Sequence, residues 1–332
     1  MTEVEETVLD VARRPLISVC IVTYNQQDYI RDAVMSVLAQ VNPADFDLQI
    51  LVGDDCSTDS TPEILQELML RHGDCMTVVT HRPNVGAAGN YQALMRRAQG
   101  DFVAHLDGDD FWLPGKLSAQ LAFLNHHQEC AAVYTGAVAV DAKGVLVGGF
   151  SNAQPDVIDF DYLLARGNFL NHSSLLYRAQ SLESLSALQM PFIDYMVHLR
   201  LAQQGRLGLL SAAYVVYRRM TSTSMLKNQF SHFDDLYMYT IVTMAAEAPE
   251  SVRYSCGATY IVNTLGTHPS WIKEKDFWSH AMSLVRRLRL RPFRLLMHMV
   301  VAFFSAGRKI LSARVSRLLY RSNALIIVHP RH

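Results

Sequence analysis

The stretch Phe-Val-Ala-His-Leu-Asp-Gly-Asp-Asp-Phe-Trp, residues 102–112, decides the fold. Its apolar start, bounded by glycines, predicts a buried strand that ends in three carboxylates, Asp107, Asp109 and Asp110. Open α/β sheets bind ligands at the carboxyl edge of their strands. Crowded carboxylates repel one another unless a cation lies among them, and hard oxygen ligands suit Mg²⁺ or Mn²⁺ held together with a diphosphate. A solvated acidic turn without metal is the alternative.

The segments around this strand predict a mainly parallel sheet, because apolar, β-branched runs alternate with helical patterns as in right-handed βαβ units. The predicted strands are residues 16–22, 48–52, 76–80, 131–140, the apolar run that starts at Phe102, and a short strand within 171–178; residues 207–217 form a further apolar segment. A loop rich in small residues is expected over 81–90, followed by a helix over 90–98. The expected fold is therefore α/β, a Rossmann-like mixed sheet flanked by helices and followed by a helical C-terminal extension.

The chain has 332 residues, of which half are apolar and 18% are charged, so it can bury a sizeable core and is not disordered. We expect a flexible leader over 1–14, the α/β domain over 15–225 and a helical extension with a basic amphipathic tail over 226–332. Five scattered cysteines without a Cys-x-x-Cys pair are typical of a reducing compartment. No signal peptide and no run long enough to span a bilayer is visible, so the expected location is cytoplasmic.

The C-terminal part of the sequence is strongly basic. From Phe277 onward it holds eleven Lys or Arg and no Asp or Glu. An apolar run over 295–304 and a basic amphipathic pattern over 308–321 accompany this bias, so we expect peripheral contact with an anionic membrane surface. A helix packed on the domain with solvated arginines is the alternative. Nucleic acid is not an expected partner, because no nucleic-acid motif accompanies the arginines.

Six short motifs follow the predicted elements in order. They are Thr23-Tyr24-Asn25, Asp54-Asp55, Asn84-Val85-Gly86 ahead of Asn90, Asp107-Gly108-Asp109-Asp110, Asp194, and Tyr217-Arg218. Each is weak alone, but in this order they resemble the family 2 glycosyltransferases with the GT-A fold, over roughly residues 15–225. The resemblance implies metal-dependent, inverting transfer of a sugar from a nucleoside-diphosphate donor, with UDP expected. The implied acceptor is a hydroxyl of a glycan or lipid-linked glycan, in cell-surface polysaccharide synthesis.

The resemblance also implies roles for single residues. Asp55 is expected to contact the nucleotide base, Asp107 and Asp109 to meet the ribose and the metal-bound diphosphate, with Asp109 as the metal ligand, and Asp194 to act as general base. Ile193 stands where the family has Glu before this aspartate. The further donor-binding candidates are Thr23, Tyr24, Asn25, Asp54, Asn84, Gly86 and Asn90. The acceptor-binding candidates, each with a packing or structural role as the alternative, are Trp112, His172, Ser173 and Arg218.

Residue chemistry agrees with this assignment. A departing diphosphate needs charge stabilisation, which a divalent ion supplies, and a sugar hydroxyl needs a base to take its proton. Asp194 also suits a helix N-cap. Two other functions stay open. A sugar nucleotidyltransferase should carry a Gly-rich, Arg/Lys signature near its first strand, where this chain has Thr-Tyr-Asn-Gln. The other is a catalytically inactive glycan-binding module, to which the missing Glu before Asp194 gives some weight.

Overall fold

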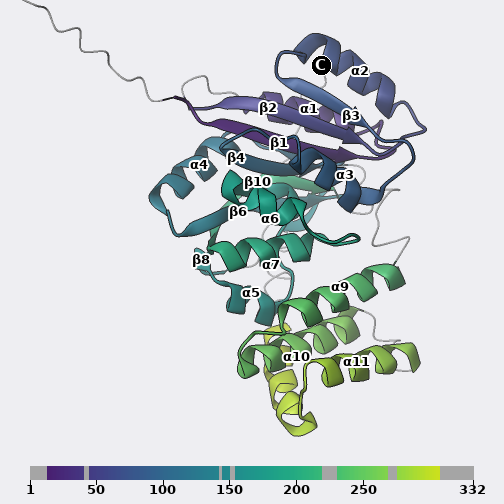
Figure 1. The fold of residues 1–332 in the computed structure, drawn as a ribbon, viewed down its shortest axis with the longest axis vertical. Coiled ribbons are helices and arrows are strands. Elements are labelled where there is room, and N and C mark those ends of the chain that lie inside the picture. Colours follow the sequence, from purple (N-terminus) through teal and green to yellow (C-terminus); the bar gives the residue numbers. More distant parts are fainter. Residues whose placement is uncertain are drawn as a thin grey trace, which may run out of the picture.

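A computed structural model describes residues 13–40, 45–141, 144–149, 154–218, 230–267 and 275–306. At its centre lies one ten-stranded mixed sheet, with the order β3-β2-β1-β4-β9-β6-β10-β5 and two further strands pairing at β6 and β10 (Figure 1). Most of the predicted leader, the predicted boundary near 226 and the amphipathic pattern over 308–321 fall outside the described residues.

The first half of the sheet is parallel, as predicted. Its strands are β1 (Leu16–Thr23), β2 (Asp47–Asp54), β3 (Met76–Thr80) and β4 (Phe102–Asp107). β1 pairs with both β2 and β4, and β2 pairs with β3. Apolar residues fill these strands because both faces are covered, which is typical of parallel sheets. The helices around the sheet are α1 (Ile30–Leu38), α2 (Thr61–His72), α3 (Gly86–Met95), α4 (Lys116–His126), α5 (Phe160–Arg166), α6 (Leu182–Ser186) and α7 (Asp194–Gln204).

The second half of the sheet is mixed. The short strand β9 (Leu176–Arg178) is antiparallel to β4 on one side and to β6 (Cys130–Val140) on the other. β6 therefore runs in the direction of β4, and β10 (Arg206–Arg218) runs parallel to β6. The remaining strands are the short, antiparallel β5 (Phe111–Trp112), β7 (Leu146–Gly149) and β8 (Val157–Ile158). The long strands thus bring their carboxyl ends to one edge.

The helix after β3 begins earlier than the sequence predicts. α3 spans Gly86–Met95, whereas the expected helix covered 90–98. Gly86 adopts φ +79° where the helix starts, a conformation that glycine reaches without steric cost. The small residues after it carry no apolar stripe, so periodicity gave no signal of a helix there. The loop after β3 is consequently short and ends on the first turn of α3.

The C-terminal extension is helical, as predicted. Its helices are α9 (Phe230–Met244), α10 (Glu250–Thr267), α11 (Lys275–Arg287) and a further helix over 292–306. Apolar side chains of α9, α10 and α11 belong to the same buried cluster as those of α5 and α7. The ring of Tyr237 stacks between Tyr195 of α7 and Tyr260 of α10, with ring centroids 5.1 and 6.0 Å apart. Within the described residues, no helix is both long and apolar enough to cross a membrane.

Candidate active site

The candidate site lies at the edge of the sheet where β1, β2 and β4 end. Strand pairing sets Thr23 beside Asp54 and Val22 beside Asp107. The motifs that follow the strands therefore meet in space, although they are about 30 and 50 residues apart in sequence. Asp194, at the start of α7, is close enough to Asp107 for the charge of that carboxylate to raise its pKa. The predicted donor, metal and base residues thus come together in one region.

Asp55 organises the donor side of this region. Its carboxylate accepts a hydrogen bond from the Val85 backbone N–H at 2.7 Å, and its carbonyl oxygen accepts one from Asn84 Nδ2 at 2.8 Å. Asn84 Oδ1 in turn accepts from the Gly86 N–H at 3.1 Å. Loop 84–86 is therefore held against the end of β2. Among the described contacts, the Asp55 carboxylate accepts a hydrogen bond through Oδ1 and not through Oδ2.

The loop after β1 is held against the loop after β2. Asn25 has φ 51°, and its backbone N–H donates to Ser57 Oγ at 2.8 Å. Asn25 Oδ1 accepts from the Thr58 N–H at the same distance. The neighbouring side chain of Tyr24 is 42% exposed. Asn25 thus fixes the loop, while the Tyr24 ring is partly exposed to solvent.

Four of the donor-binding candidates are buried: Thr23, Asp54, Asp55 and Asn90, each at most 3% exposed. Asn90 is 1% exposed; its Nδ2 donates to the Gly53 carbonyl at 2.7 Å and its Oδ1 lies 3.1 Å from His81 Nε2. A side chain at Gly53 would collide with this amide, since an added Cβ would lie 1.9 Å from Asn90 Oδ1. Asp54 is 1% exposed, and neither of its carboxylate oxygens has a hydrogen-bond partner among the described residues. Asn90 therefore supports the end of β2 from below.

The acidic turn after β4 contains carboxylates in different surroundings. Asp110 is fully buried and accepts from Ser173 Oγ at 2.6 Å and from the Arg218 N–H at 2.9 Å. Burial, with the charges of Asp109 and Asp107, raises the pKa of Asp110 well above its usual value. The Asp107 side chain is 41% exposed and lies 2.9 Å from His105 Nε2. Asp110 is consequently a structural residue, whereas Asp107 and Asp109 are both partly exposed.

Gly108 allows this turn to lie against the end of β1. A Cβ at this position would lie 2.9 Å from the Val22 carbonyl oxygen and 3.0 Å from Thr23 Cβ. Both of these neighbours belong to the strand itself and have little freedom to shift. The glycine between Asp107 and Asp109 is therefore required by the close approach of the two backbones.

Two of the acceptor-binding candidates have structural positions. Trp112 is 2% exposed, and its Nε1 donates to the Ser173 carbonyl at 2.7 Å. The Arg218 guanidinium donates to the Asp109 carbonyl at 2.7 Å and to Asp32 Oδ2 at 2.8 Å. The assignment of Trp112 to an acceptor surface is thus corrected, because a buried ring cannot stack on a sugar. Arg218, whose side chain is 12% exposed, fastens the acidic turn to α1.

Asp194 occupies the first turn of α7 and is partly exposed. Its Oδ1 accepts from the Tyr195 N–H at 2.7 Å, and Asn168 Nδ2 lies 3.1 and 3.2 Å from its two oxygens. Burial raises the pKa of Asp194 to about 6; the hydrogen bonds from Tyr195 and Asn168 oppose that rise and the charge of Asp107 adds to it. A carboxylate with a pKa near neutrality is suited to accept a proton and release it again.

The segment before β9 supports the acidic turn from the other side. Ser173 is fully buried, and its hydroxyl lies between Asp107 and Asp110, at 3.2 and 2.6 Å from their oxygens. His172 is partly exposed, packs on the ring of His105 with centroids 3.9 Å apart, and lies 3.0 Å from His198 through its Nδ1. Ser173 is thus committed to the turn, while His172 keeps one edge near the site.

The oxygen ligands at the acidic turn fit a hard divalent ion. Mg²⁺ and Mn²⁺ accept one or two carboxylates and complete their coordination with diphosphate and water. Asp107 and Asp109 supply such carboxylates at a partly exposed turn, with a glycine between them. In the described part of the chain, no three His, Cys, Asp or Glu side chains form a closed metal cage.

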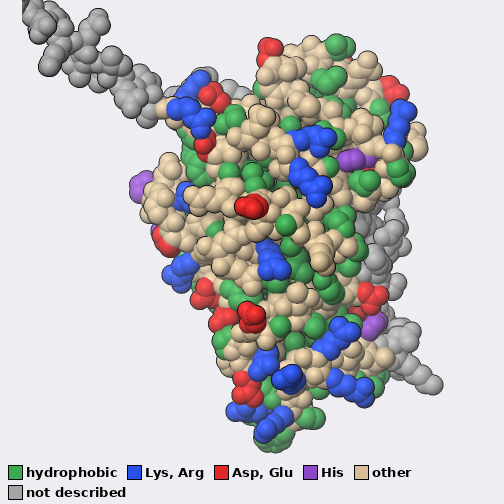
Figure 2. Space-filling view, in the orientation of Figure 1, with side chains coloured by type: hydrophobic (Ala, Val, Ile, Leu, Met, Phe, Trp, Pro, Cys, Tyr) green, Lys and Arg blue, Asp and Glu red, His purple; other side chains and the backbone are tan. Residues whose placement is uncertain are grey.

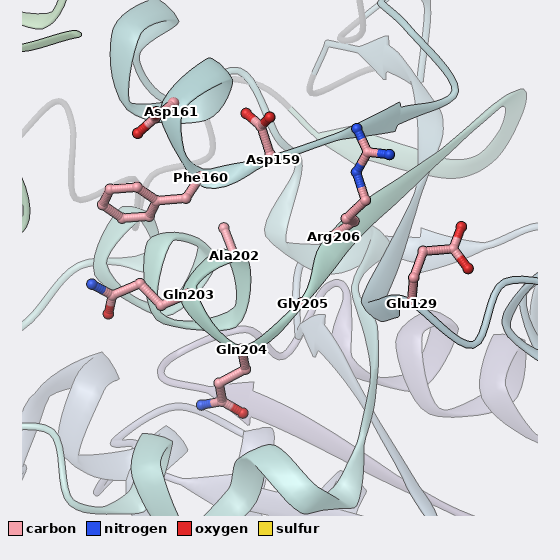
Figure 3. A pocket seen from close by; sticks show the side chains of 9 residues that line it. All are labelled: Glu129, Asp159, Phe160, Asp161, Ala202, Gln203, Gln204, Gly205 and Arg206. Atoms are coloured by element: carbon pink, nitrogen blue, oxygen red, sulfur yellow. The ribbon is translucent and has the colours of Figure 1, made fainter. Parts of the chain in front are cut away.

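A recess of about 450 Å³ lies elsewhere, at the amino ends of β6 and β10 (Figure 3). Glu129, Asp159 and Asp161 lie around it together with Arg206. Asp159 accepts from the Tyr162 N–H at 2.9 Å and so caps α5. Because the recess lies at the sheet edge opposite to the carboxyl ends, its carboxylates are not part of the candidate active site.

Comparison with known proteins identifies the domain that carries these strand ends. The model of the family described as "Glycosyl transferase family 2" matches residues 18–167. This part of the chain is a family 2 glycosyltransferase domain. Relatives of the glycosyltransferase domain include the uncharacterized protein Rv1520 of Mycobacterium tuberculosis, 33% identical over 206 residues, 61% of this chain and 58% of that protein. The chain thus spans less than two thirds of the length of this relative.

Another relative covers more of the sequence beyond the glycosyltransferase domain. It is the Escherichia coli UDP-Glc:alpha-D-GlcNAc-diphosphoundecaprenol beta-1,3-glucosyltransferase WfaP, which is 26% identical over 256 residues, 76% of this chain and 95% of that protein. The alignment therefore reaches past the family match and includes part of the C-terminal extension.

Solved structures confirm the predicted fold. S. aureus TarS residues 1–349, in complex with UDP-GlcNAc, matches with a TM-score of 0.65 and 19% identity, over 92% of this chain and 91% of that one. The mannosyltransferase PcManGT from Pyrobaculum calidifontis, in complex with GDP-Man and Mn²⁺, matches with a TM-score of 0.50 and 18% identity, over 90% and 88%. At these identities the likeness concerns the fold, a GT-A sheet with flanking helices.

Proposed function

We propose that this chain is a metal-dependent, inverting glycosyltransferase that moves a sugar from a UDP-sugar to a hydroxyl of a lipid-linked or growing cell-surface glycan. The observation that carries the proposal is the convergence of Asp55, Asp107 and Asp109 with the half-buried Asp194 at one sheet edge. A nucleotide site and a base side by side are what direct transfer between a nucleotide sugar and an alcohol requires.

In this proposal the loops after β1 and β2 bind the nucleotide. The exposed Tyr24 ring offers a stacking surface for the base, and the free oxygen of Asp55 can accept from a base N–H. Asn84 and Gly86 hold loop 84–86 against the Asp55 backbone, next to the proposed base site. Thr23, Asn25 and Asn90 position the strand and loop ends and need not touch the nucleotide themselves.

The carboxylates after β4 bind the diphosphate side of the donor. Asp107 is oriented by His105 and Ser173, and it faces the ribose and diphosphate. Asp109 would hold Mg²⁺ or Mn²⁺, and such an ion would supply positive charge to stabilise the departing diphosphate. PcManGT, with GDP-Man and Mn²⁺ in its crystal structure, supports a divalent ion in a protein of similar fold.

Asp194 acts as the general base on the acceptor. The carboxylate removes the proton of the acceptor hydroxyl as the oxygen attacks the anomeric carbon, and the bond from that carbon to the diphosphate oxygen breaks. UDP leaves with the bonding electron pair. A single attack from the face opposite the leaving group inverts the anomeric centre. The structural partners of Trp112, Ser173 and Arg218 leave His172, partly exposed beside the site, as the remaining acceptor candidate.

The acceptor proposal rests on the C-terminal helices. Apolar side chains of the helix over 292–306 are exposed to an unusual degree; they are Phe293, Leu296, Met297, Val300, Val301, Phe303 and Phe304, between 47% and 78% exposed. Five arginines lie over 286–294 without an acidic residue among them. Basic side chains gather at this end of the molecule in Figure 2. Exposed apolar groups together with arginines fit the interface of an anionic membrane, where a lipid-linked acceptor such as the one named for WfaP resides.

Replacing Phe293 and Phe304 together by Ser is expected to weaken binding to anionic vesicles about tenfold or more. Full burial of an aromatic side chain contributes on the order of 1.5–3 kcal/mol, and a side chain that enters the membrane interface contributes part of this to the free energy of vesicle binding. The measurement is co-sedimentation of the full chain with vesicles that contain phosphatidylserine, at low and high salt. Raised salt should weaken binding of the parent chain, since it screens the arginines.

Leu70→Ser provides the matched control, because Leu70 of α2 is 80% exposed but lies on the N-terminal half of the sheet. This variant should sediment like the parent chain. If the parent chain does not bind anionic vesicles at all, the membrane proposal is wrong and the acceptor need not be lipid-linked.

The pH dependence of kcat should reflect Asp194. Since burial raises its pKa to about 6, the carboxylate is protonated below that pH and cannot take the acceptor proton. We therefore expect kcat to fall as pH drops through about 6 and to reach a plateau above it. Initial rates at saturating donor between pH 5 and 8 measure this limb, and a flat profile over that range would exclude Asp194 as the base.

A screen of nucleotide sugars by thermal shift tests the donor proposal. A ligand that binds only the folded chain stabilises it and so raises the melting temperature. At a ligand concentration a hundred times Kd, the free energy of unfolding increases by about 2.7 kcal/mol. UDP-sugars with Mn²⁺ should raise it more than GDP-sugars or either component alone. Equal shifts for all nucleotides would contradict the proposed UDP specificity.

A further inference from the structure

A chain of polar side chains within hydrogen-bond distance of one another leads away from Asp194 through the buried His198, and the mechanism above does not use it. Asn168 Nδ2 lies 3.1 and 3.2 Å from the two Asp194 oxygens. Asn168 Oδ1 lies 3.2 Å from His198 Nδ1, and His198 Nε2 lies 3.0 Å from His172 Nδ1. The groups come from the loop after α5, from α7 and from the turn before β9. Four side chains are thus linked in a single row that ends on the proposed base.

Hydrogen-bonding capacity fixes the direction of this row. An ionised carboxylate only accepts, so the amide group of Asn168 must face it with Nδ2. Asn168 Oδ1 then accepts from His198, which requires the proton of His198 on Nδ1. His198 Nε2 is consequently an acceptor, and His172 must carry its proton on Nδ1. Every donor in the row points toward Asp194.

The interior position of His198 keeps this arrangement in place. His198 is fully buried, and burial, followed by the charge of His105, lowers its pKa to about 3. Burial and the nearby His105 and His198 likewise lower the pKa of His172 well below its usual value. Both rings therefore stay neutral near pH 7. A proton on His198 Nε2 would abolish the acceptor that His172 requires.

The backbone of Asn168 is held as firmly as its side chain. Its N–H donates to the Tyr237 hydroxyl of α9 at 3.1 Å. Gly167, directly before it, has φ +76°, and a Cβ there would lie 2.9 Å from the same hydroxyl oxygen. The preceding glycine and a C-terminal helix thus fix the point from which the Asn168 amide reaches Asp194.

We propose that Asn168, oriented by His198 and His172, is a positioning residue that holds the Asp194 carboxylate toward the acceptor hydroxyl. This inference rests on the proposed role of Asp194 as general base. With both oxygens near one amide, the carboxylate cannot rotate freely about its Cβ–Cγ bond, and the oxygen that takes the proton is held in one place. Enforced geometry of this kind is worth one to two orders of magnitude in rate.

Other titratable groups also face Asp194. Asp107 and His105 of β4 act on its charge, and the hydroxyls of Tyr134 on β6 and Tyr237 on α9 lie close enough for Asp194 to raise their pKa values. None of these four groups is hydrogen-bonded to the Asp194 carboxylate by a described contact. Removing the Asn168 side chain should therefore change the orientation and the pKa of the Asp194 carboxylate more directly than removing any of these four groups.

The test is the pH profile of kcat for Asn168→Ala, measured at saturating donor on the full chain. Loss of a hydrogen bond to the charged form raises the pKa of a carboxyl group, so the acid limb should move above its position in the parent chain. We expect kcat on the plateau to fall about tenfold to hundredfold, while the Kd of UDP by calorimetry stays unchanged. Asn168→Asp should move the limb further upward, since it sets a second carboxylate beside the first.

Two His198 variants separate positioning from packing. His198→Asn keeps a donor near the place of Nδ1 and should retain most of the plateau rate, whereas His198→Phe keeps the ring volume and loses the donor, so its kcat should fall as in Asn168→Ala. An unmoved acid limb in a folded Asn168→Ala variant overturns the inference, provided that Asp194→Asn is inactive. Normal turnover of Asp194→Asn would instead overturn the base assignment, and the positioning role with it.

Discussion

Asp194→Asn is expected to lower kcat by about 10²-fold or more, the usual scale for loss of a general base. The substitution keeps the shape of the side chain and one oxygen that can accept from the Tyr195 N–H and from Asn168. The fold, the melting temperature and the Kd of UDP should therefore hardly change. Because the base acts in the chemical step and not in donor binding, the effect belongs in kcat.

Asp161→Asn is the matched control for this experiment. Asp161 lies in the first turn of α5 at the recess on the opposite edge of the sheet, and removing its charge should leave kcat unchanged. Near-normal turnover of Asp194→Asn would show that Asp194 serves only as the first residue of α7. His172, which is partly exposed beside the acidic turn, would then be the next residue to replace.

Asp109→Asn is expected to abolish metal-dependent binding of UDP and to lower transfer by at least about 10²-fold. The amide oxygen is neutral and binds a hard divalent ion less strongly than a carboxylate does. A bound ion stabilises the charge of the transition state by several kcal/mol, so the transfer rate should fall when the metal no longer binds. Calorimetric titration of UDP with and without Mn²⁺ measures the binding term directly.

Asp59→Asn serves as the control for Asp109. The Asp59 carboxylate accepts from the Thr61 N–H at 2.9 Å and from the Gln27 N–H at 3.1 Å, so both of its oxygens hold the loops after β1 and β2 together. This variant should bind UDP with the same metal dependence and be only mildly less stable. Unchanged metal-dependent binding in Asp109→Asn would remove Asp109 from the metal site.

The parallel half of the fold could be predicted from the sequence because each of its strands is a continuous apolar segment that can be recognised locally. Buried strands such as β4 are continuous apolar runs, and their polar ends mark the functional edge. The start of α3 escaped prediction since Gly86 and the small residues after it carry no helical periodicity. The insertion of β9 between β4 and β6 depends on pairing between segments far apart in the chain, which no local pattern encodes.

Site residues could be predicted where a polar motif follows a predicted strand. They could not be predicted where the role of a side chain depends on whether the folded protein buries it. Trp112 and Arg218 are the last residues of β5 and β10, but tertiary contacts bury the Trp112 ring and pair Arg218 with Asp32. Asn168 and His198 escaped notice for the opposite reason. The only available signal was the spacing of His198 four residues after Asp194 on one helix face. The contact of Asn168 with Asp194 joins residues 26 positions apart and has no signature in the sequence.

Release of UDP during incubation of the full chain with UDP-sugars and Mn²⁺ is the most direct test of the central claim. The sugars should be offered with and without lipid-linked glycan acceptors, and Asp194→Asn should be assayed in parallel. We predict UDP release that depends on metal and acceptor and that falls about 10²-fold or more in Asp194→Asn. No UDP release by the folded parent chain from any UDP-sugar, with either Mg²⁺ or Mn²⁺ and any acceptor, would contradict a transferase and favour an inactive glycan-binding module.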